Sequence, residues 1–201
     1  MRALGGVLLM RIVGGQRRGL RLADVGAGDM AAHLRPTPDR VREAIFNILA
    51  SDQDRNPVSG ARVLDLFAGT GALGLEALSR GAIHVTFVED GAAGHALIRE
   101  NIERMHATGD TRLYRRDATR MGPNRGAPFT LVFLDPPYGQ GLGEQALASA
   151  RDGGWITADA MIVWEENAPM HAPDGFSVTG HRRYGETHVT FLRADQGQVP
   201  V

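Results

Sequence analysis

Several classes of protein are excluded by residues that this chain lacks. It contains no cysteine, which excludes disulfide bonds and thiolate metal sites and is typical of a reducing compartment. Its 22 basic residues include no lysine, so its positive side chains are all arginines. An all-arginine set is typical of a GC-rich genome, although the forked donors of arginine also suit phosphate groups.

Long apolar runs are also missing. No stretch approaches the roughly 18 apolar residues of a membrane-spanning helix. The opening residues, MRALGGVLLMRIVGG, lack the length and the cleavage site of a signal peptide. The histidines are scattered, with no metal-ligand spacing to an acid. We therefore expect a cytoplasmic protein that binds neither a membrane nor a metal ion.

The bulk composition fits one soluble domain, since 43% of the 201 residues are apolar and 22% are charged. The net charge is −1, yet residues 1–50 hold eight arginines against four acids. Such a basic segment predicts contact with an anionic polymer such as RNA, although a solvated surface explains it equally well. The candidate phosphate contacts are Arg17, Arg18, Arg21, Arg35, Arg40 and Arg42.

The order of predicted elements indicates an α/β fold. Residues 11–22 predict a small β-hairpin, and residues 37–49 a helix that Thr37 can cap with Pro38 in its first position. Helices then alternate with strands predicted at 62–67, 84–89, 111–117, 129–135 and 161–166, and two final strands turn at residues 184–187. We expect a doubly wound, mostly parallel, seven-stranded Rossmann-like sheet with a C-terminal antiparallel hairpin. Residues 1–50 would extend a ligand-binding domain of residues 51–201 within one compact unit.

Acidic residues mark the ends of four predicted strands. Asp65 lies near the end of the first, and Glu89, Asp117 and Asp135 close the next three. Ligands of such sheets bind beyond the carboxyl ends of the strands. Asp117 alone could equally be a helix cap, but the whole set predicts a ligand site at this edge.

A glycine loop lies at the same edge. The segment DLFAGTGALG matches G-x-G-x-x-G at Gly69, Gly71 and Gly74, between a strand and a helix. With Glu89 available for a ribose, this pattern alone also fits a nicotinamide-dependent oxidoreductase. Asp65, however, places a negative charge where a pyrophosphate would lie. It suits a cationic ligand instead, and S-adenosylmethionine carries both an ammonium and a sulfonium group.

The segment FLDPPYGQG follows the fourth strand. Asp135 offers a carboxylate, and the stiff pair Pro136 and Pro137 fixes the direction of a bare carbonyl. Tyr138 can stack on a base, a contact worth about 1–3 kcal/mol in single-stranded recognition. Together these groups could hold and activate an exocyclic amine of a flipped base. Alone, Asp-Pro-Pro-Tyr would be interpreted as a rigid turn.

The chain resembles bacterial RsmD-type methyltransferases, which modify the N2 amine of guanine in small-subunit (16S) ribosomal RNA. The motifs are RIVGGQRRGLRL, RPTPDRVREAIFNIL, VLDLFAGTGALGLEALSRGA, FLDPPYG and YGETHVTFL, spread from about Met10 to Arg193. The resemblance implies S-adenosylmethionine as cofactor and ribosomal RNA, or the assembling small subunit, as partner. It implies catalytic residues Asp135, Pro136, Pro137 and Tyr138, and cofactor contacts Asp65, Phe67, Gly69, Gly71, Glu89, Asp117 and Asp135. We expect a monomer.

Four other functions stay open on the sequence. A DNA adenine-N6 methyltransferase can share the DPPY motif, but 201 residues leave little room for a target-recognition domain. Protein glutamine-N5 methyltransferases typically carry Asn where Asp135 stands. A nicotinamide-dependent oxidoreductase would need a substrate domain with a proton donor, and none is apparent. A nucleotide-binding module without catalysis would use only the glycine loop.

Overall fold

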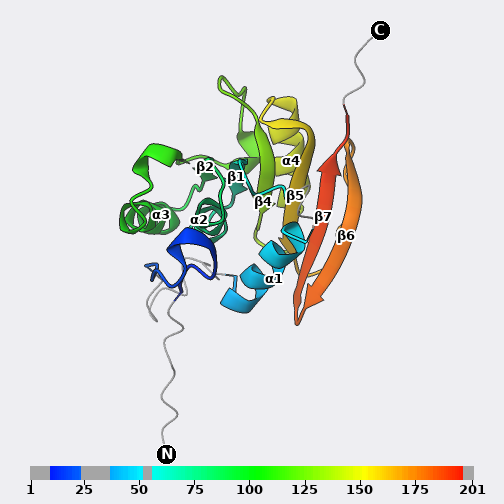
Figure 1. Cartoon of the computed structure of the whole chain (residues 1–201). Helices are drawn as coiled ribbons and strands as arrows, with labels where there is room; N and C mark the ends of the chain where they lie inside the picture. Colours follow the sequence, from blue (N-terminus) through cyan, green and yellow to red (C-terminus); the bar gives the residue numbers. More distant parts are fainter. Residues whose placement is uncertain (1–9, 24–36, 52–55, 197–201) are drawn as a thin grey trace, which may run out of the picture.

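One seven-stranded sheet runs through the computed structural model, which describes residues 10–23, 37–51 and 56–196 (Figure 1). The strand order is β3-β2-β1-β4-β5-β7-β6. The strands are β1 (Arg62–Leu66), β2 (His84–Val88), β3 (Thr111–Tyr114), β4 (Phe129–Leu134), β5 (Ile156–Glu166), β6 (Phe176–Tyr184) and β7 (Thr187–Ala194). The first five are parallel, whereas β7 runs antiparallel to both β5 and β6. The predicted fold class, including the terminal hairpin, is confirmed.

Helices cover both faces of the sheet, which explains why the central strands are apolar on both sides. The core on one face joins α1 (Asp39–Leu49), α2 (Ala72–Ser79) and α3 (Ala92–Arg104) to the sheet. The core on the other face joins α4 (Leu142–Asp152) and the short helix η5 (Ala118–Arg120) to it. Leu64 and Leu66 face the second core while Val63 faces the first, as alternation along β1 requires.

Two predicted strands have different bounds in the structure. The third ends at Tyr114 rather than at Asp117, because Asp117 accepts from the backbone N–H and the hydroxyl of Thr119 and so begins η5. The fifth begins at Ile156 rather than at residue 161. A register shift between Phe129 and Leu131 lets β4 pair with this longer strand.

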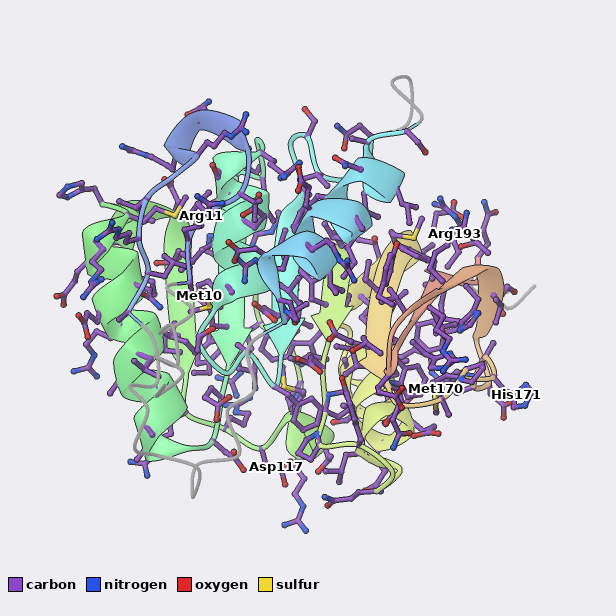
Figure 2. The ribbon with its side chains drawn as sticks, turned by 90° about the horizontal axis from the view of Figure 1, so that it is seen from below. Met10, Arg11, Asp117, Met170, His171 and Arg193 are labelled. Atoms are coloured by element: carbon purple, nitrogen blue, oxygen red, sulfur yellow. The ribbon has the colours of Figure 1, made fainter. Side chains whose placement is uncertain are left out.

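The N-terminal segment of residues 10–23 packs on α2 and α3, and Figure 2 shows Met10 and Arg11 beside these helices. The predicted hairpin is reduced to one antiparallel bridge between Arg11 and Arg21, with the short helix η1 (Gly15–Arg17) in its turn. The buried carboxylate of Glu76 accepts from the backbone N–H groups of Val13 and Gly14 at 2.7 and 2.8 Å. One more short helix, η4 (Thr108–Asp110), precedes β3.

Helix α1 begins at Asp39, one residue later than predicted. Thr37 does not cap it, because its hydroxyl donates to Glu165 Oε2 at 3.1 Å instead. Within the described ranges, every helix is too short or too polar to cross a membrane. The same ranges contain no cluster of three or more side chains suited to a metal ion.

Candidate active site

The carboxyl ends of β1 and β4 lie side by side at the centre of the sheet. Asp65 and Leu66 pair with Phe133 and Leu134, and the backbone N–H of Asp135 donates to Leu66 O at 3.4 Å. The strand order reverses between β1 and β4, which makes this the topological switch point where such sheets bind ligands. The fold therefore brings the glycine loop and the DPPY segment to one place.

The glycine loop between β1 and α2 has a tightly constrained backbone. Gly69 and Gly71 have φ of 56° and 76°, in the left-handed region that glycine adopts without steric cost. Phe67 also has a positive φ, 57°, which is unfavourable for an aromatic residue and is typical of functional sites. A side chain at Gly74 would lie 2.5 Å from the ring of Phe87, so glycine there permits close packing of α2 on the sheet.

Glu89, directly after β2, binds the glycine loop between β1 and α2 and the residues that precede α3. Its carboxylate accepts from the backbone N–H groups of Gly69 and Gly91, each at 2.8 Å. Burial raises the pKa of Glu89, and these two donors oppose the rise. Each oxygen keeps a further lone pair, so the carboxylate can still accept from a ribose hydroxyl.

Asp65 is buried beneath the glycine loop, with 2% of its surface exposed. One oxygen accepts from the backbone N–H of Gly74 at 2.9 Å. Burial, and to a lesser degree the charge of Glu89, raises the pKa of Asp65 to about 8. A carboxyl group in this state gains from a nearby cation, because the cation favours its ionised form.

Asp117 lies past β3 at the same edge of the sheet (Figure 2). One oxygen is occupied by Thr119, whose hydroxyl and backbone N–H lower the pKa of Asp117. The other oxygen lies 3.7 Å from Arg120 Nε. The cofactor contact predicted for Asp117 therefore stays a prediction that depends on this second oxygen.

The DPPY segment leaves β4 toward the end of β5. Pro136 is buried, Pro137 is exposed and Tyr138 is 37% exposed, so the ring has room to contact a ligand. Asp135 is partly buried, and desolvation raises its pKa well above the ordinary value, helped by the charges of Glu165 and then Asp65. Desolvation also raises the pKa of Tyr138, with the charge of Asp135 adding to it.

Two carboxylates that sequence reasoning missed complete this half of the edge. Glu165 and Glu166 end β5 and are 4% and 5% exposed. Burial raises the pKa of Glu165 to about 7, although its bonds with Thr37 and Tyr138 oppose the rise. Glu166 accepts from the backbone N–H groups of Gly139 and Asn167 at 3.2 and 3.0 Å. The signal was present in the sequence, because two acids follow the apolar run MIVW of a buried strand.

Arg42 is excluded from the predicted phosphate contacts, because it is 1% exposed. Its guanidinium donates to the backbone oxygens of Thr37 and Arg11 at 2.9 and 2.5 Å and to Asp39 Oδ1 at 2.6 Å. It joins the start of α1 to the N-terminal segment. The burial of an arginine on an otherwise amphipathic helix depends on partners remote in sequence, so the pattern alone could not predict it.

The other arginines predicted to contact RNA are at the surface where they are described. The exposed ones are Arg17, Arg18 and Arg21 on the N-terminal segment and Arg40 on α1, while Arg35 lies outside the described residues. The backbone N–H of Arg17 donates to Ser79 Oγ at the end of α2, and the backbone oxygen of Arg21 accepts from Arg104 at the end of α3. Their role in RNA binding stays a prediction.

The site fits a cationic cofactor and an amine-bearing substrate. Asp65, Asp135 and Glu165 share raised pKa values, and burial is the largest cause for each. A bound cation or an N–H donor relieves this unfavourable accumulation of carboxylates. A pyrophosphate would add negative charge to it, so the structure favours a sulfonium-bearing ligand over a nicotinamide dinucleotide.

Known proteins resemble the chain over nearly its full length. A family model described as conserved hypothetical protein 95 matches residues 10–193. The ribosomal RNA small subunit methyltransferase D of Escherichia coli strain K12 is 38% identical over 94% of this chain and 92% of its own length. The protein of the same name from Haemophilus influenzae is 30% identical over 88% of this chain and 89% of its own. The solved structure of yhhF from Escherichia coli, 34% identical, covers 94% of this chain and 99% of that chain with a TM-score of 0.77.

Proposed function

The chain belongs to the conserved hypothetical protein 95 family, as its motifs predict, and on that premise we propose that it is an S-adenosylmethionine-dependent methyltransferase of small-subunit ribosomal RNA. The acceptor atom that we propose is the exocyclic N2 amine of a guanine. The observation that carries the proposal is the meeting, at the switch point, of the glycine loop and a DPPY segment lined by buried carboxylates. The names of the similar proteins support the RNA substrate, and the resemblance found in the sequence supports the guanine.

The cofactor site that we propose lies between the ends of β1, β2 and β3. S-adenosylmethionine supplies an electrophilic methyl group on a sulfonium when it is bound. Asp65 would favour its positive charges, and Glu89 would accept from its ribose hydroxyls. The second oxygen of Asp117 would accept from its adenine amine. Phe67, Gly69 and Gly71 would shape the loop that lies against it.

The substrate site that we propose is formed by the DPPY segment. The amine of guanine is a weak nucleophile, because its lone pair is delocalised into the ring. Asp135 and the Pro136 carbonyl would accept from the two amine hydrogens and so turn the lone pair toward the methyl group, while Pro137 stiffens the turn. Tyr138 would stack on the base, because part of its ring is exposed. The ionised form of Asp135 also offers an acceptor for the proton that the amine must lose.

The remaining features of the proposal concern partners and organisation. We propose that Arg17, Arg18, Arg21 and Arg40 bind phosphates of the RNA, as exposed arginines of residues 1–50. Residues 51–201 would carry both the cofactor site and the substrate site. We further propose that the protein acts as a monomer in the cytoplasm, on ribosomal RNA or on the assembling small subunit.

Transfer of a labelled methyl group tests the function. The protein is incubated with methyl-labelled S-adenosylmethionine and, in separate reactions, small ribosomal subunits, naked small-subunit RNA, DNA or release factors. Label in subunits or their RNA, with N2-methylguanosine found by mass spectrometry of the nucleosides, is the expected result. Label confined to DNA or protein would contradict the RNA substrate, and tight binding of NADH without S-adenosylmethionine would contradict the cofactor.

A further inference from the structure

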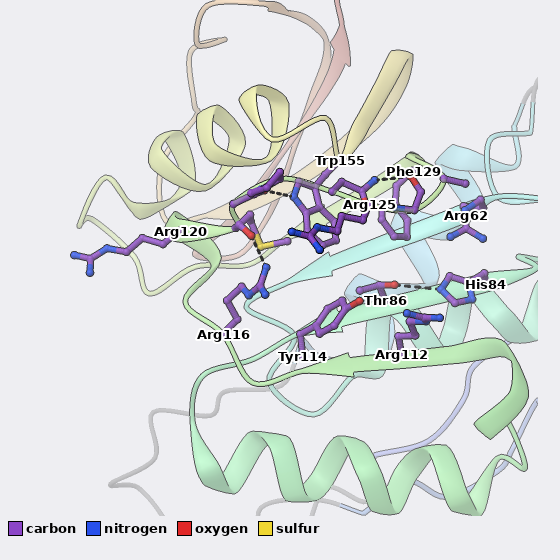
Figure 3. Close-up of a pocket in the computed structure, with 16 residues that line it drawn as sticks. Arg62, His84, Thr86, Arg112, Tyr114, Arg116, Arg120, Arg125, Phe129 and Trp155 are labelled. Carbon is purple, nitrogen blue, oxygen red and sulfur yellow. Dashed lines mark hydrogen bonds between the residues drawn. The ribbon is translucent and has the colours of Figure 1, made fainter.

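A second concave site lies on the sheet away from the carboxylates. It is a cavity of about 920 Å³ beneath the loop of residues 121–128, over β1, β2 and β3 (Figure 3). The side chains of Thr86 and Tyr114 line it from the sheet, and Trp155 closes its far wall. Phe129 and Trp155 belong to the core shared with α4, so the cavity and α3 lie on opposite faces of the sheet.

The cavity is strongly basic. Five of its sixteen lining residues are arginines, and none of these lining residues is acidic. The arginines are Arg62, Arg112, Arg116, Arg120 and Arg125. His84 lines the same wall, and desolvation together with the charges of Arg62 and Arg112 lowers its pKa. In a chain of net charge −1, so many cations around one cavity indicate an anionic ligand.

Among the described residues, several of these guanidinium groups have donors without a hydrogen-bond partner. Arg62 lies 5.2 Å over the ring of Phe129, and its buried Nε has no hydrogen-bond partner within the described ranges. Arg112 and Arg125 are exposed. Arg116 donates to Met121 O through one nitrogen and stacks 5.5 Å from the ring of Tyr114. Planar forked donors held in this way suit phosphate oxygens.

One end of the cavity lies near the carboxyl edge, because its lining residues Arg116 and Arg120 flank Asp117 in the chain. Arg120 is on its rim, is 86% exposed at the side chain and follows Asp117 in η5. His84 and Arg62 begin β2 and β1 at the opposite edge. A strand of five residues spans about 13 Å. The basic wall is therefore longer than one phosphate group and can contact more than one.

We propose that this cavity binds backbone phosphates of the RNA substrate, away from the nucleotide that enters the active site. The proposal rests on the proposed function for the identity of the polymer. Bases contribute little here, because Phe129 and Trp155 are only 3% and 4% exposed and stack on each other at 6.1 Å. The contacts are thus with phosphate charge, and the affinity that they add is independent of sequence.

A double variant, Arg112→Gln with Arg125→Gln, tests the site, and Arg99→Gln with Arg182→Gln is its control. All four arginines are exposed, and both variants lose the same charge. Binding of naked small-subunit RNA is titrated at several salt concentrations. We expect the cavity variant to lower the slope of log K against log salt by about 1.4, since each phosphate contact contributes ~0.7 for single strands. An unchanged slope, or the same reduction in the control, would overturn the proposal.

Methyl transfer separates this proposal from the proposed function. For the cavity variant we expect an unchanged affinity for S-adenosylmethionine, an unchanged kcat and a KM for RNA that rises about tenfold. If the unaltered protein methylates no RNA, the proposed function fails while the salt titration still decides on the cavity. If adenosine monophosphate binds and competes at Arg112 and Arg125 but RNA does not, the cavity is a nucleotide site and the RNA proposal is wrong.

The absence of cysteine allows a second test by cross-linking. Arg125→Cys carries one photoactivatable group in the cavity, and Arg99→Cys carries it on α3, across the sheet. We expect RNA to cross-link to the first variant at nucleotides near the methylated guanine and not to the second. Equal cross-linking at both positions would mean that the contact is unspecific and would contradict the proposal.

Discussion

The two halves of the carboxyl edge hold their carboxylates in different ways. On the β2 and β3 side, Glu89 accepts from two backbone N–H groups, and Asp117 accepts from Thr119. On the β4 and β5 side, Glu165 and Glu166 also accept from nearby donors, whereas desolvation, and then the charges of Glu165 and Asp65, raise the pKa of Asp135. Glu89 and Asp117 thus have their donors within the protein. No hydrogen bond from the described residues opposes the raised pKa of Asp135, so a ligand that brings N–H groups or positive charge gains most at Asp135.

The largest effect expected from breaking this contrast is at Asp135. Asp135→Asn removes the negative acceptor of the proposed substrate site, and we expect kcat for RNA methylation to fall by about 10²–10⁴-fold. Affinity for S-adenosylmethionine, measured by calorimetry, should change little. Asp90→Asn is the control, because Asp90 is an exposed acid at the same edge. A loss of cofactor affinity with normal turnover would contradict the catalytic role proposed for Asp135.

Glu89 should give the next largest effect, on binding rather than on turnover. Glu89→Gln removes a charged acceptor of the proposed ribose contact, and hydrogen bonds to charged groups are worth about 1.5–3 kcal/mol. We expect the Kd for S-adenosylmethionine to rise by about 10–100-fold in calorimetry. Asp117→Asn should cost less, since one of its oxygens already serves Thr119 and its side chain is 45% exposed. The reverse order would contradict the assignment of the ribose to Glu89.

Glu165→Gln should separate stability from activity. The pKa of Glu165 is raised from 4.5 to about 7, so between those pH values the folded protein keeps a proton that the unfolded chain has released. Stability therefore falls as pH rises through this window and stays lower above it. The variant removes this dependence of folding stability on pH, and we expect its Tm at pH 8 to rise by about 3 °C. Asp65, with a pKa of about 8, still makes its own contribution to the pH dependence of folding stability in the variant.

The same variant should change the pH dependence of methylation. Because the charge of Glu165 raises the pKa of Asp135, removing it should move the acid limb of kcat/KM to lower pH. Initial rates between pH 5 and 9 measure this limb. Glu43→Gln, at an exposed acid on α1, is the control that should alter neither the limb nor the Tm. An unmoved limb would show that the two carboxyl groups are not coupled.

The smallest effect is expected from the N-terminal arginines. Arg18→Gln or Arg40→Gln each removes one exposed charge, and we expect the salt slope of RNA binding to fall by at most about 0.7. Arg42→Gln should instead lower the Tm, because Arg42 is buried and bonded to Asp39. Thermal denaturation followed by circular dichroism, beside the salt titration of RNA binding, distinguishes these outcomes. A salt-slope change for Arg42→Gln without a Tm change would contradict its structural role.

The sequence predicted most of what local pattern determines. The parallel strands, the glycine loop and the DPPY segment follow from short apolar runs and from glycine and proline, and the structure has them at one edge. The prediction failed where residues remote in sequence determine the contacts of a side chain. Thr37 bonds to Glu165, 128 residues away, and Arg42 bonds to the backbone of Arg11. Glu165 and Glu166 were overlooked because their meaning depends on β5 lying beside β4.

The anchoring of residues 10–23 has a consequence for the newly made protein. The backbone N–H of Ala23 donates to Asn101 Oδ1, 78 residues later, and that of Val13 donates to Glu76, 63 residues later. At a synthesis rate of about 5–20 residues per second, Ala23 is added to the chain roughly 4–16 s before Asn101. Met10, Ile12 and Leu22, which are buried in the finished protein, lack their partners on α2 and α3 for part of that interval. The first described segment to be synthesised thus cannot complete its contacts until α3 is made, and its apolar side chains are a part of the nascent chain that a chaperone would shield.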